Sequence, residues 1–101
     1  MLAGLLSLGG GATASASESG ATGHPTGCLA EKPAGNWGAV VRCTNANGGS
    51  YRAVANCRSV DTGREAQFYG DWRQDGFSYA YCQGSYQAYS AGFVSSPRNN
   101  T

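Results

Sequence analysis

Four cysteines in a short chain constrain the fold more than any other feature of this sequence. The chain has 101 residues, and successive cysteines are 15, 14 and 25 positions apart: Cys28, Cys43, Cys57 and Cys82. An even cysteine count in a small exported chain is typical of disulfide bonds rather than of reactive thiols. Because so short a chain builds only a small core, its stability depends on such covalent links. We therefore expect a small scaffold held by two disulfides.

The N-terminal residues indicate that the chain is exported. Residues 2–8 contain four leucines, and Ala14-Ser15-Ala16 is a small-x-small cleavage site. No Lys or Arg precedes Lys32, so the positive stretch of a complete signal peptide is missing, which an upstream start codon would explain. The apolar run is also too short for a membrane-spanning helix, which needs about 20 residues. We expect residues 1–16 to be a signal peptide, truncated at its N-terminus, and the mature protein to be secreted without a membrane anchor.

The remaining residues divide into a leader, one domain and a tail. Residues 17–27 are polar and rich in Gly and Pro, which predicts a disordered leader. Residues 28–94 contain all four cysteines and all 11 aromatic residues, and they form the predicted domain. Residues 95–101 are predicted to be a disordered tail. The formal net charge of +1 lacks the basic excess of a nucleic-acid-binding protein, so we expect no nucleic-acid partner.

Alternating apolar residues predict an all-β domain. Five strand-like segments are separated by turn-forming residues: 37–43, 51–57, 65–72, 77–82 and 86–94. The turn residues between the first two segments, and Asp75-Gly76 between the third and fourth, predict hairpins. The expected fold is a small five-stranded antiparallel meander that forms a barrel or a sandwich.

The first two segments each have one face suited to the core. Alternate residues share a face in a strand, which predicts two inward-facing sets: Trp37, Ala39, Val41 and Cys43 in the first segment, and Tyr51, Ala53, Ala55 and Cys57 in the second. We expect these two faces to form about half of the core.

Four cysteines allow three disulfide pairings. In a straight hairpin of residues 37–43 and 51–57, Cys43 and Cys57 lie about 20 Å apart. A disulfide needs Cα atoms within about 7 Å, so this pair is disfavoured. In the predicted meander, Cys57 and Cys82 end at the same edge of the sheet. We favour Cys28–Cys43 with Cys57–Cys82, and Cys28–Cys57 with Cys43–Cys82 is the alternative.

The sequence contains no convincing catalytic or metal-binding constellation. Its single histidine, His24, lies in the predicted leader, where a general base is not held beside a nucleophile. The cysteine spacings do not match those of a zinc site. Three carboxylates, Glu65, Asp71 and Asp75, are better explained as strand and turn residues than as an acid–base pair. We therefore expect a protein that is not an enzyme and has no metal or other cofactor.

Aromatic residues give the stronger functional signal. In residues 77–82, Phe77, Tyr79 and Tyr81 alternate with smaller side chains and Cys82. If Cys82 points into the core, the three rings point outward. Exposed rings on a flat sheet suit sugar rings or a protein partner, although such rings also pack in cores. Our leading hypothesis is a monomeric binding module in which these three rings and Trp72 contact an extracellular glycan or a cell-surface partner.

A second hypothesis is an inhibitor of an extracellular hydrolase. Residues 58–64 follow a cysteine that we expect to be disulfide-bonded, and this loop contains Arg58 and Arg64. A basic residue on a braced loop is typical of small secreted protease inhibitors, because bracing reduces the entropy lost on binding. Arg73, in the turn that follows Trp72, is a further candidate of this kind.

Three segments resemble small exported proteins of high-GC actinobacteria: VVRCTNANGGSYRAVANC, FYGDW and FSYAYC. Such proteins typically combine an Ala-x-Ala signal site, two disulfides and a Tyr-Gly-x-Trp segment, which Tyr69-Gly70-Asp71-Trp72 matches here. Because most of them have no assigned activity, the resemblance implies a compartment and a β fold but no functional residue. The Trp-Arg-Tyr triplet of actinobacterial amylase inhibitors is absent, since Gln74 follows Trp72-Arg73.

Overall fold

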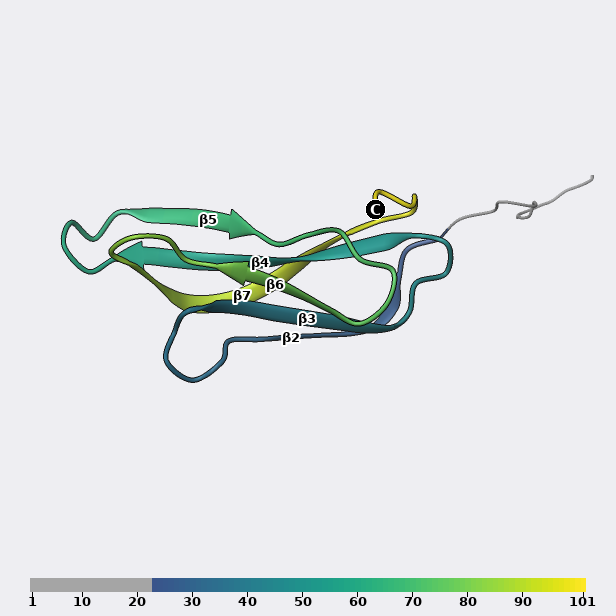
Figure 1. Ribbon diagram of the computed structural model, residues 1–101, viewed down its shortest axis with the longest axis horizontal. Coiled ribbons are helices and arrows are strands. Elements are labelled where there is room, and N and C mark those ends of the chain that lie inside the picture. The colour runs from purple at the N-terminus through teal and green to yellow at the C-terminus, as the bar shows by residue number, and fades with distance from the viewer. Residues whose placement is uncertain (1–22) are drawn as a thin grey trace, which may run out of the picture.

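The computed structural model describes residues 23–101, so the predicted signal peptide and most of the predicted leader lie outside the described residues. The described chain consists of six strands (Figure 1): β2 (Thr26–Glu31), β3 (Gly38–Asn45), β4 (Ser50–Ser59), β5 (Glu65–Tyr69), β6 (Phe77–Tyr81) and β7 (Tyr86–Ser96). Across residues 23–101 no helix is present that is long and apolar enough to cross a membrane.

The strands form two antiparallel, three-stranded sheets that pack face to face. One sheet has the strand order β2-β3-β6 and the other has the order β5-β4-β7. The expectation of an all-β protein with two disulfides is confirmed. The closed barrel and the count of five strands are wrong, because the sheets stay separate and the segment before residue 32 supplies the additional strand β2.

Neither predicted hairpin forms. Only four residues connect β3 to β4, yet these two strands lie in different sheets. The strands β5 and β6 also lie in different sheets. Each of β3 and β4 has one face of small apolar side chains. Placing the two strands opposite each other buries both faces in one core, whereas a hairpin would place them side by side in one sheet.

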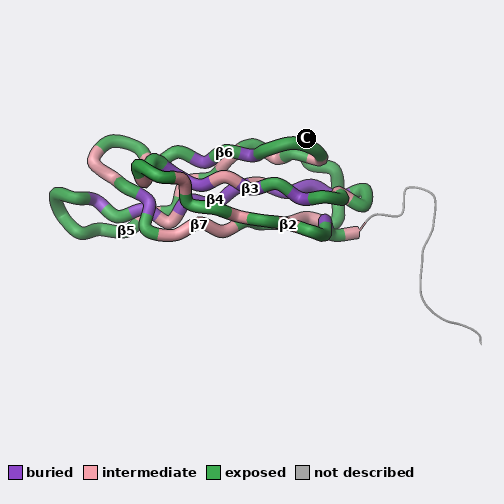
Figure 2. The backbone as a smooth tube through the Cα atoms, turned by 90° about the horizontal axis from the view of Figure 1, so that it is seen from below, coloured by how far each residue is buried: buried purple, intermediate pink, exposed green. Residues whose placement is uncertain are grey.

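The buried residues, purple in Figure 2, form a core between the two sheets. This core is made mostly of small side chains. The inward-facing residues predicted for these strands are buried, with Trp37 as the exception: Ala39, Val41, Cys43, Tyr51, Ala53, Ala55 and Cys57. Tyr51 is the largest fully buried side chain, and its hydroxyl donates a 2.6 Å hydrogen bond to the carbonyl of Gly76. This bond fastens the connection between β5 and β6 to the core.

The disulfides are Cys28–Cys43 and Cys57–Cys82, the pairing favoured from the sequence. Cys28 and Cys43 face each other on the paired strands β2 and β3. The meander used to derive the second pair is wrong, however. Cys57 in β4 and Cys82 after β6 belong to different sheets, and their Cα atoms are 6.0 Å apart across the sandwich.

The folded domain extends beyond residues 28–94 at both ends. Thr26 and Gly27 of the predicted leader belong to β2, and residues 95–96 of the predicted tail belong to β7. Polar composition predicted coil here, but hydrogen bonds to the rest of the domain hold both ends. The Asn47 side chain donates to the His24 carbonyl (3.0 Å), and the Ser50 hydroxyl donates to the Arg98 carbonyl (2.7 Å).

Candidate functional site

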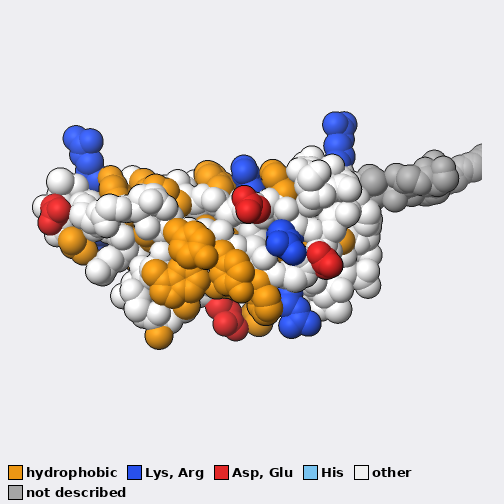
Figure 3. Space-filling model, viewed as in Figure 1, with side chains coloured by type: hydrophobic (Ala, Val, Ile, Leu, Met, Phe, Trp, Pro, Cys, Tyr) orange, Lys and Arg blue, Asp and Glu red, His pale blue; other side chains and the backbone are white. Residues whose placement is uncertain are grey.

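Four aromatic rings form a continuous row on the outer face of the β2-β3-β6 sheet. We call Trp37, Tyr81, Tyr79 and Phe77 the aromatic row. Neighbouring ring centroids along it are separated by 5.2, 6.4 and 6.1 Å, and neighbouring planes differ by 26°, 20° and 35°. Figure 3 shows hydrophobic side chains gathered into one patch along β6. The row therefore presents a single apolar surface.

Strand alternation in β6 produces most of this row. Ser78 and Ala80 are buried, whereas Phe77, Tyr79 and Tyr81 are 46%, 45% and 54% exposed. The outward direction expected for these three rings is therefore the one observed. Rings at this level of exposure leave apolar area in contact with water, and contiguous apolar patches on a small protein often mark binding sites.

Trp37 is the member of the row that the sequence did not predict. The alternation pattern assigns it to the core, but β3 begins only at Gly38, and Trp37 follows the left-handed residue Asn36 (φ 58°). The Trp37 carbonyl accepts a 2.9 Å hydrogen bond from the Cys82 N–H, and the indole ring lies over Tyr81. The sequence signal for this position was Gly38, which directly follows Trp37, because a glycine in a strand often marks a place where another backbone approaches closely.

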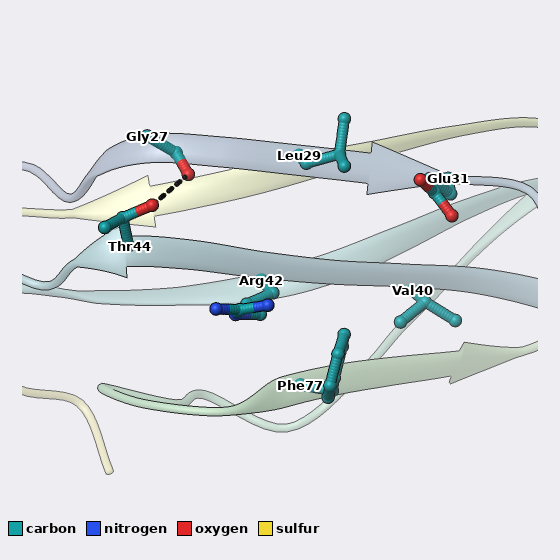
Figure 4. Close-up of a pocket in the computed structure, with 7 residues that line it drawn as sticks. All are labelled: Gly27, Leu29, Glu31, Val40, Arg42, Thr44 and Phe77. Atoms are coloured by element: carbon teal, nitrogen blue, oxygen red, sulfur yellow. Dashed lines mark hydrogen bonds between the residues drawn. The ribbon is translucent and has the colours of Figure 1, made fainter.

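A groove of about 460 Å³ lies beside the aromatic row, on the outer face of the sheet and over β3, which runs between β2 and β6 (Figure 4). It is lined by side chains and backbone from β2, β3 and β6: Gly27, Leu29, Glu31, Val40, Arg42, Thr44 and Phe77. The Phe77 ring bounds one side, and the Arg42 guanidinium lies 5.8 Å from its centroid. The groove thus adds a cation, a carboxylate and a hydroxyl to the apolar surface of the row.

Trp72 does not join the aromatic row, contrary to the prediction. Its ring covers the guanidinium of Arg52, on the outer face of the other sheet, with 4.7 Å between the guanidinium carbon and the ring centroid. The predicted strand 65–72 is not continuous, because β5 ends at Tyr69 and an irregular segment separates it from the next bridge to β4, at Arg73. Phe77, Tyr79 and Tyr81 therefore remain as the predicted members of the candidate site.

The three arginines of the inhibitor hypothesis do not form one surface. Arg58 lies within β4 rather than on a loop, and its guanidinium donates a 3.0 Å hydrogen bond to Glu65. Arg73 pairs with Tyr51, seven residues from Arg58 along β4, which places the two arginines about 23 Å apart. All three arginines are exposed, but of the three Arg64 alone lies on the β4–β5 loop.

Two neighbours bind the carboxylate of Glu65. Hydrogen bonds from the Arg58 guanidinium and the Tyr89 hydroxyl hold the pKa of Glu65 below its usual value of 4.5. The hydrogen bond between Tyr89 and Glu65 raises the pKa of Tyr89, because ionisation of the hydroxyl would place two negative charges together. Since the folded pKa of Glu65 is lowered, the stabilisation from this pair is present above about pH 4.5 and is lost as the pH falls through the folded pKa. Glu65 thus has a structural role in this sheet.

The chemistry available at the candidate site is stacking and hydrogen bonding. Within residues 23–101, no three His, Cys, Asp or Glu side chains gather as a metal site would require. All four cysteines are held in disulfides. No family model, curated protein or solved structure matches the chain.

Proposed function

We propose that this protein is a secreted, non-catalytic binding protein that holds an extracellular glycan against its aromatic row. The observation that carries the proposal is the contiguous set of four rings on one outer sheet face. The C–H faces of sugar rings pack on aromatic faces, and the contact removes apolar surface of both partners from water. Two disulfides are compatible with an extracellular location.

The spacing of the rings supports a chain-like ligand. Neighbouring centroids lie between 5.2 and 6.4 Å apart, which is comparable to the length of one sugar residue. Successive rings can therefore contact successive residues of one glycan chain. The adjacent groove offers Glu31, Arg42 and Thr44 as hydrogen-bond partners for hydroxyl groups along the same chain.

Hydrolase inhibition is the alternative proposal, and it has less support. Of its three arginines, Arg58 is paired with Glu65, and Arg73 lies at the other end of β4. The remaining candidate, Arg64, is on a loop braced by a 2.8 Å hydrogen bond from the Ser59 N–H to its carbonyl. One braced arginine is a smaller surface than the aromatic row.

Depletion by insoluble polymers tests the glycan proposal. We expect the oxidised protein to be removed from solution by one of four polymers, namely peptidoglycan, chitin, cellulose or starch. Tyr79→Ala should weaken this binding more than tenfold, since truncating a central aromatic residue of an interface costs about 2 kcal/mol or more. The Tyr79 ring is about half exposed, so the variant should unfold at nearly the wild-type temperature.

Tyr89→Ala is the matched control. Tyr89 is 44% exposed, nearly the same as Tyr79 at 45%, but it covers Arg58 on the other sheet. This variant should bind as the wild type does. The proposal is contradicted if no polymer depletes the wild-type protein, or if the two variants lose binding equally.

A further inference from the structure

On the outer face of the β5-β4-β7 sheet, one arginine packs against two aromatic rings. The guanidinium carbon of Arg52 lies 4.4 Å from the centroid of Tyr69 and 4.7 Å from the centroid of Trp72. Both distances are well inside the limit of about 6 Å for a favourable cation–π contact. We call Arg52, Tyr69 and Trp72 the arginine clamp. It lies on the opposite sheet from the aromatic row and is independent of the function proposed above.

An extra residue in the chain after β5 brings the two rings together. Val54 pairs with Tyr69, whereas Tyr51 pairs with Arg73, so three steps along β4 match four steps along the neighbouring segment. In a regular strand, Tyr69 and Trp72 would point to opposite faces, because they are three residues apart. The additional residue acts as a β-bulge and places both rings on the outer face.

Gly70 makes this bulge possible. Its N–H donates a 2.9 Å hydrogen bond to the carbonyl of Ala53, so the chain stays attached to β4 beyond the end of β5. A side chain at Gly70 would overlap the carbonyl oxygen of Tyr79 in the opposite sheet. The segment Tyr69-Gly70-Asp71-Trp72 therefore fits only with glycine at its second position, and it carries both rings of the clamp.

The guanidinium of Arg52 has no anionic partner within the described part of the chain. The ion pairs of residues 23–101 are Arg58–Glu65 and Arg73–Asp75. The Nε atom of Arg52 is buried and makes no hydrogen bond. Arg52 as a whole is partly exposed, and its two Nη atoms are not among the buried unpaired atoms of residues 23–101. Both rings pack against the guanidinium, and its Nη edge is the part that can donate to a ligand.

Arg58 lies on the same face of β4 as Arg52, but its guanidinium is paired with a carboxylate. Its guanidinium also covers one ring, at 4.7 Å from the centroid of Tyr89, and it donates to the carboxylate of Glu65. Arg52 has two rings and no carboxylate. A guanidinium fixed in this way loses little side-chain entropy on binding, and its paired donors match an anion that presents two oxygen atoms.

We propose that the arginine clamp binds an oxyanion that presents two oxygen atoms, as a carboxylate or a phosphate group does. The two Nη atoms donate to the two oxygens, while Tyr69 and Trp72 hold the guanidinium plane in position. A single charged contact open to water binds a free anion with a dissociation constant on the order of 1 mM or weaker. The group recognised here is therefore expected to be part of a larger ligand.

An NMR titration of the oxidised protein tests the proposal. The Trp72 indole N–H and the Arg52 Nε–H signals are followed while acetate or phosphate is added against sodium chloride of matched ionic strength. We expect saturable shifts of both signals with at least one of the two anions, and the two arms distinguish a carboxylate from a phosphate ligand. The Arg58 Nε–H signal should not show saturable shifts, because Glu65 occupies that guanidinium.

Arg52→Lys is the decisive variant, because it keeps the positive charge but removes the planar pair of donors. It should weaken anion binding at Trp72 by about tenfold or more. Arg58→Lys is its matched control and should leave the Trp72 response unchanged. Shifts that match those in sodium chloride, or saturable shifts that persist in Arg52→Lys, would overturn the proposal. Dispersed amide signals in each variant show that the fold is retained during the comparison.

Discussion

The double variant Cys57→Ala/Cys82→Ala is expected to be largely unfolded at room temperature. This disulfide links the two sheets and closes a loop of 25 residues, for which the chain-entropy model gives a loss of about 3 kcal/mol or more. The Cys57 side chain is fully buried, so truncation also leaves a small cavity. A domain of this size has only about 3–5 kcal/mol of net stability from its core. Urea unfolding followed by circular dichroism measures the loss.

Cys28→Ala/Cys43→Ala provides the comparison for this prediction. Its disulfide closes a shorter loop of 15 residues between strands that are already paired by backbone hydrogen bonds. We therefore expect a smaller destabilisation, with a cooperative unfolding transition still present. Equal losses in the two double variants would show that the link between the sheets has no special role.

Gly38→Ala is expected to lower the free energy of unfolding by about 3 kcal/mol or more, at the upper end of the range for overpacked sites. A Cβ atom at this position would overlap the carbonyl oxygen of Ala80 in the paired strand β6, and backbone atoms cannot move aside as a flexible side chain can. The substitution should also shift Trp37 relative to Tyr81, because Gly38 follows Trp37 directly. Thermal unfolding and Trp37 fluorescence report the two effects.

Gly92→Ala is the control for that substitution. Gly92 lies within β7, pairs with Val54, and has open space where a Cβ atom would be. The free energy of unfolding of the Gly92→Ala variant should stay within about 0.5 kcal/mol of the wild-type value, or rise slightly because alanine restricts the unfolded chain. A loss in Gly92→Ala as large as that in Gly38→Ala would mean that both reflect strand propensity rather than a steric clash.

Local patterns in the sequence predicted β3 to β7 and most of their buried faces, but neither β2 nor how the strands pair. The alternation in β3 and β4 identifies Val41, Ala53 and Ala55 as buried, because side-chain direction depends only on position within a strand. Pairing depends on which faces meet across the core. The turn-forming residues 46–49 are compatible with a hairpin and with a crossover between sheets alike, so they could not distinguish the two.

In the candidate site too, the residues within a strand could be predicted from the sequence, and those outside the strands could not. Phe77, Tyr79 and Tyr81 follow from alternation within one strand, so the sequence was sufficient to predict them. Trp37 and Trp72 lie just outside strands, where alternation no longer applies. Trp37 reaches the aromatic row through a close approach at Gly38, and Trp72 moves to the opposite sheet through the bulge after Tyr69. Both depend on contacts between segments far apart in the sequence.

The two tryptophans of the chain lie on opposite sheets, and this provides the most direct test of the central claim. Trp72→Phe leaves Trp37 in the aromatic row as the only tryptophan, and Trp37→Phe leaves Trp72 in the arginine clamp. The emission of each variant is titrated with soluble hexasaccharides of chitin, cellulose and starch and with a soluble peptidoglycan fragment. Our account predicts that one of these ligands changes the emission of Trp37 in a saturable way, and that the three uncharged hexasaccharides leave the emission of Trp72 unaltered. A saturable change at Trp72 alone, or no change at Trp37 with any of the four ligands, would contradict it.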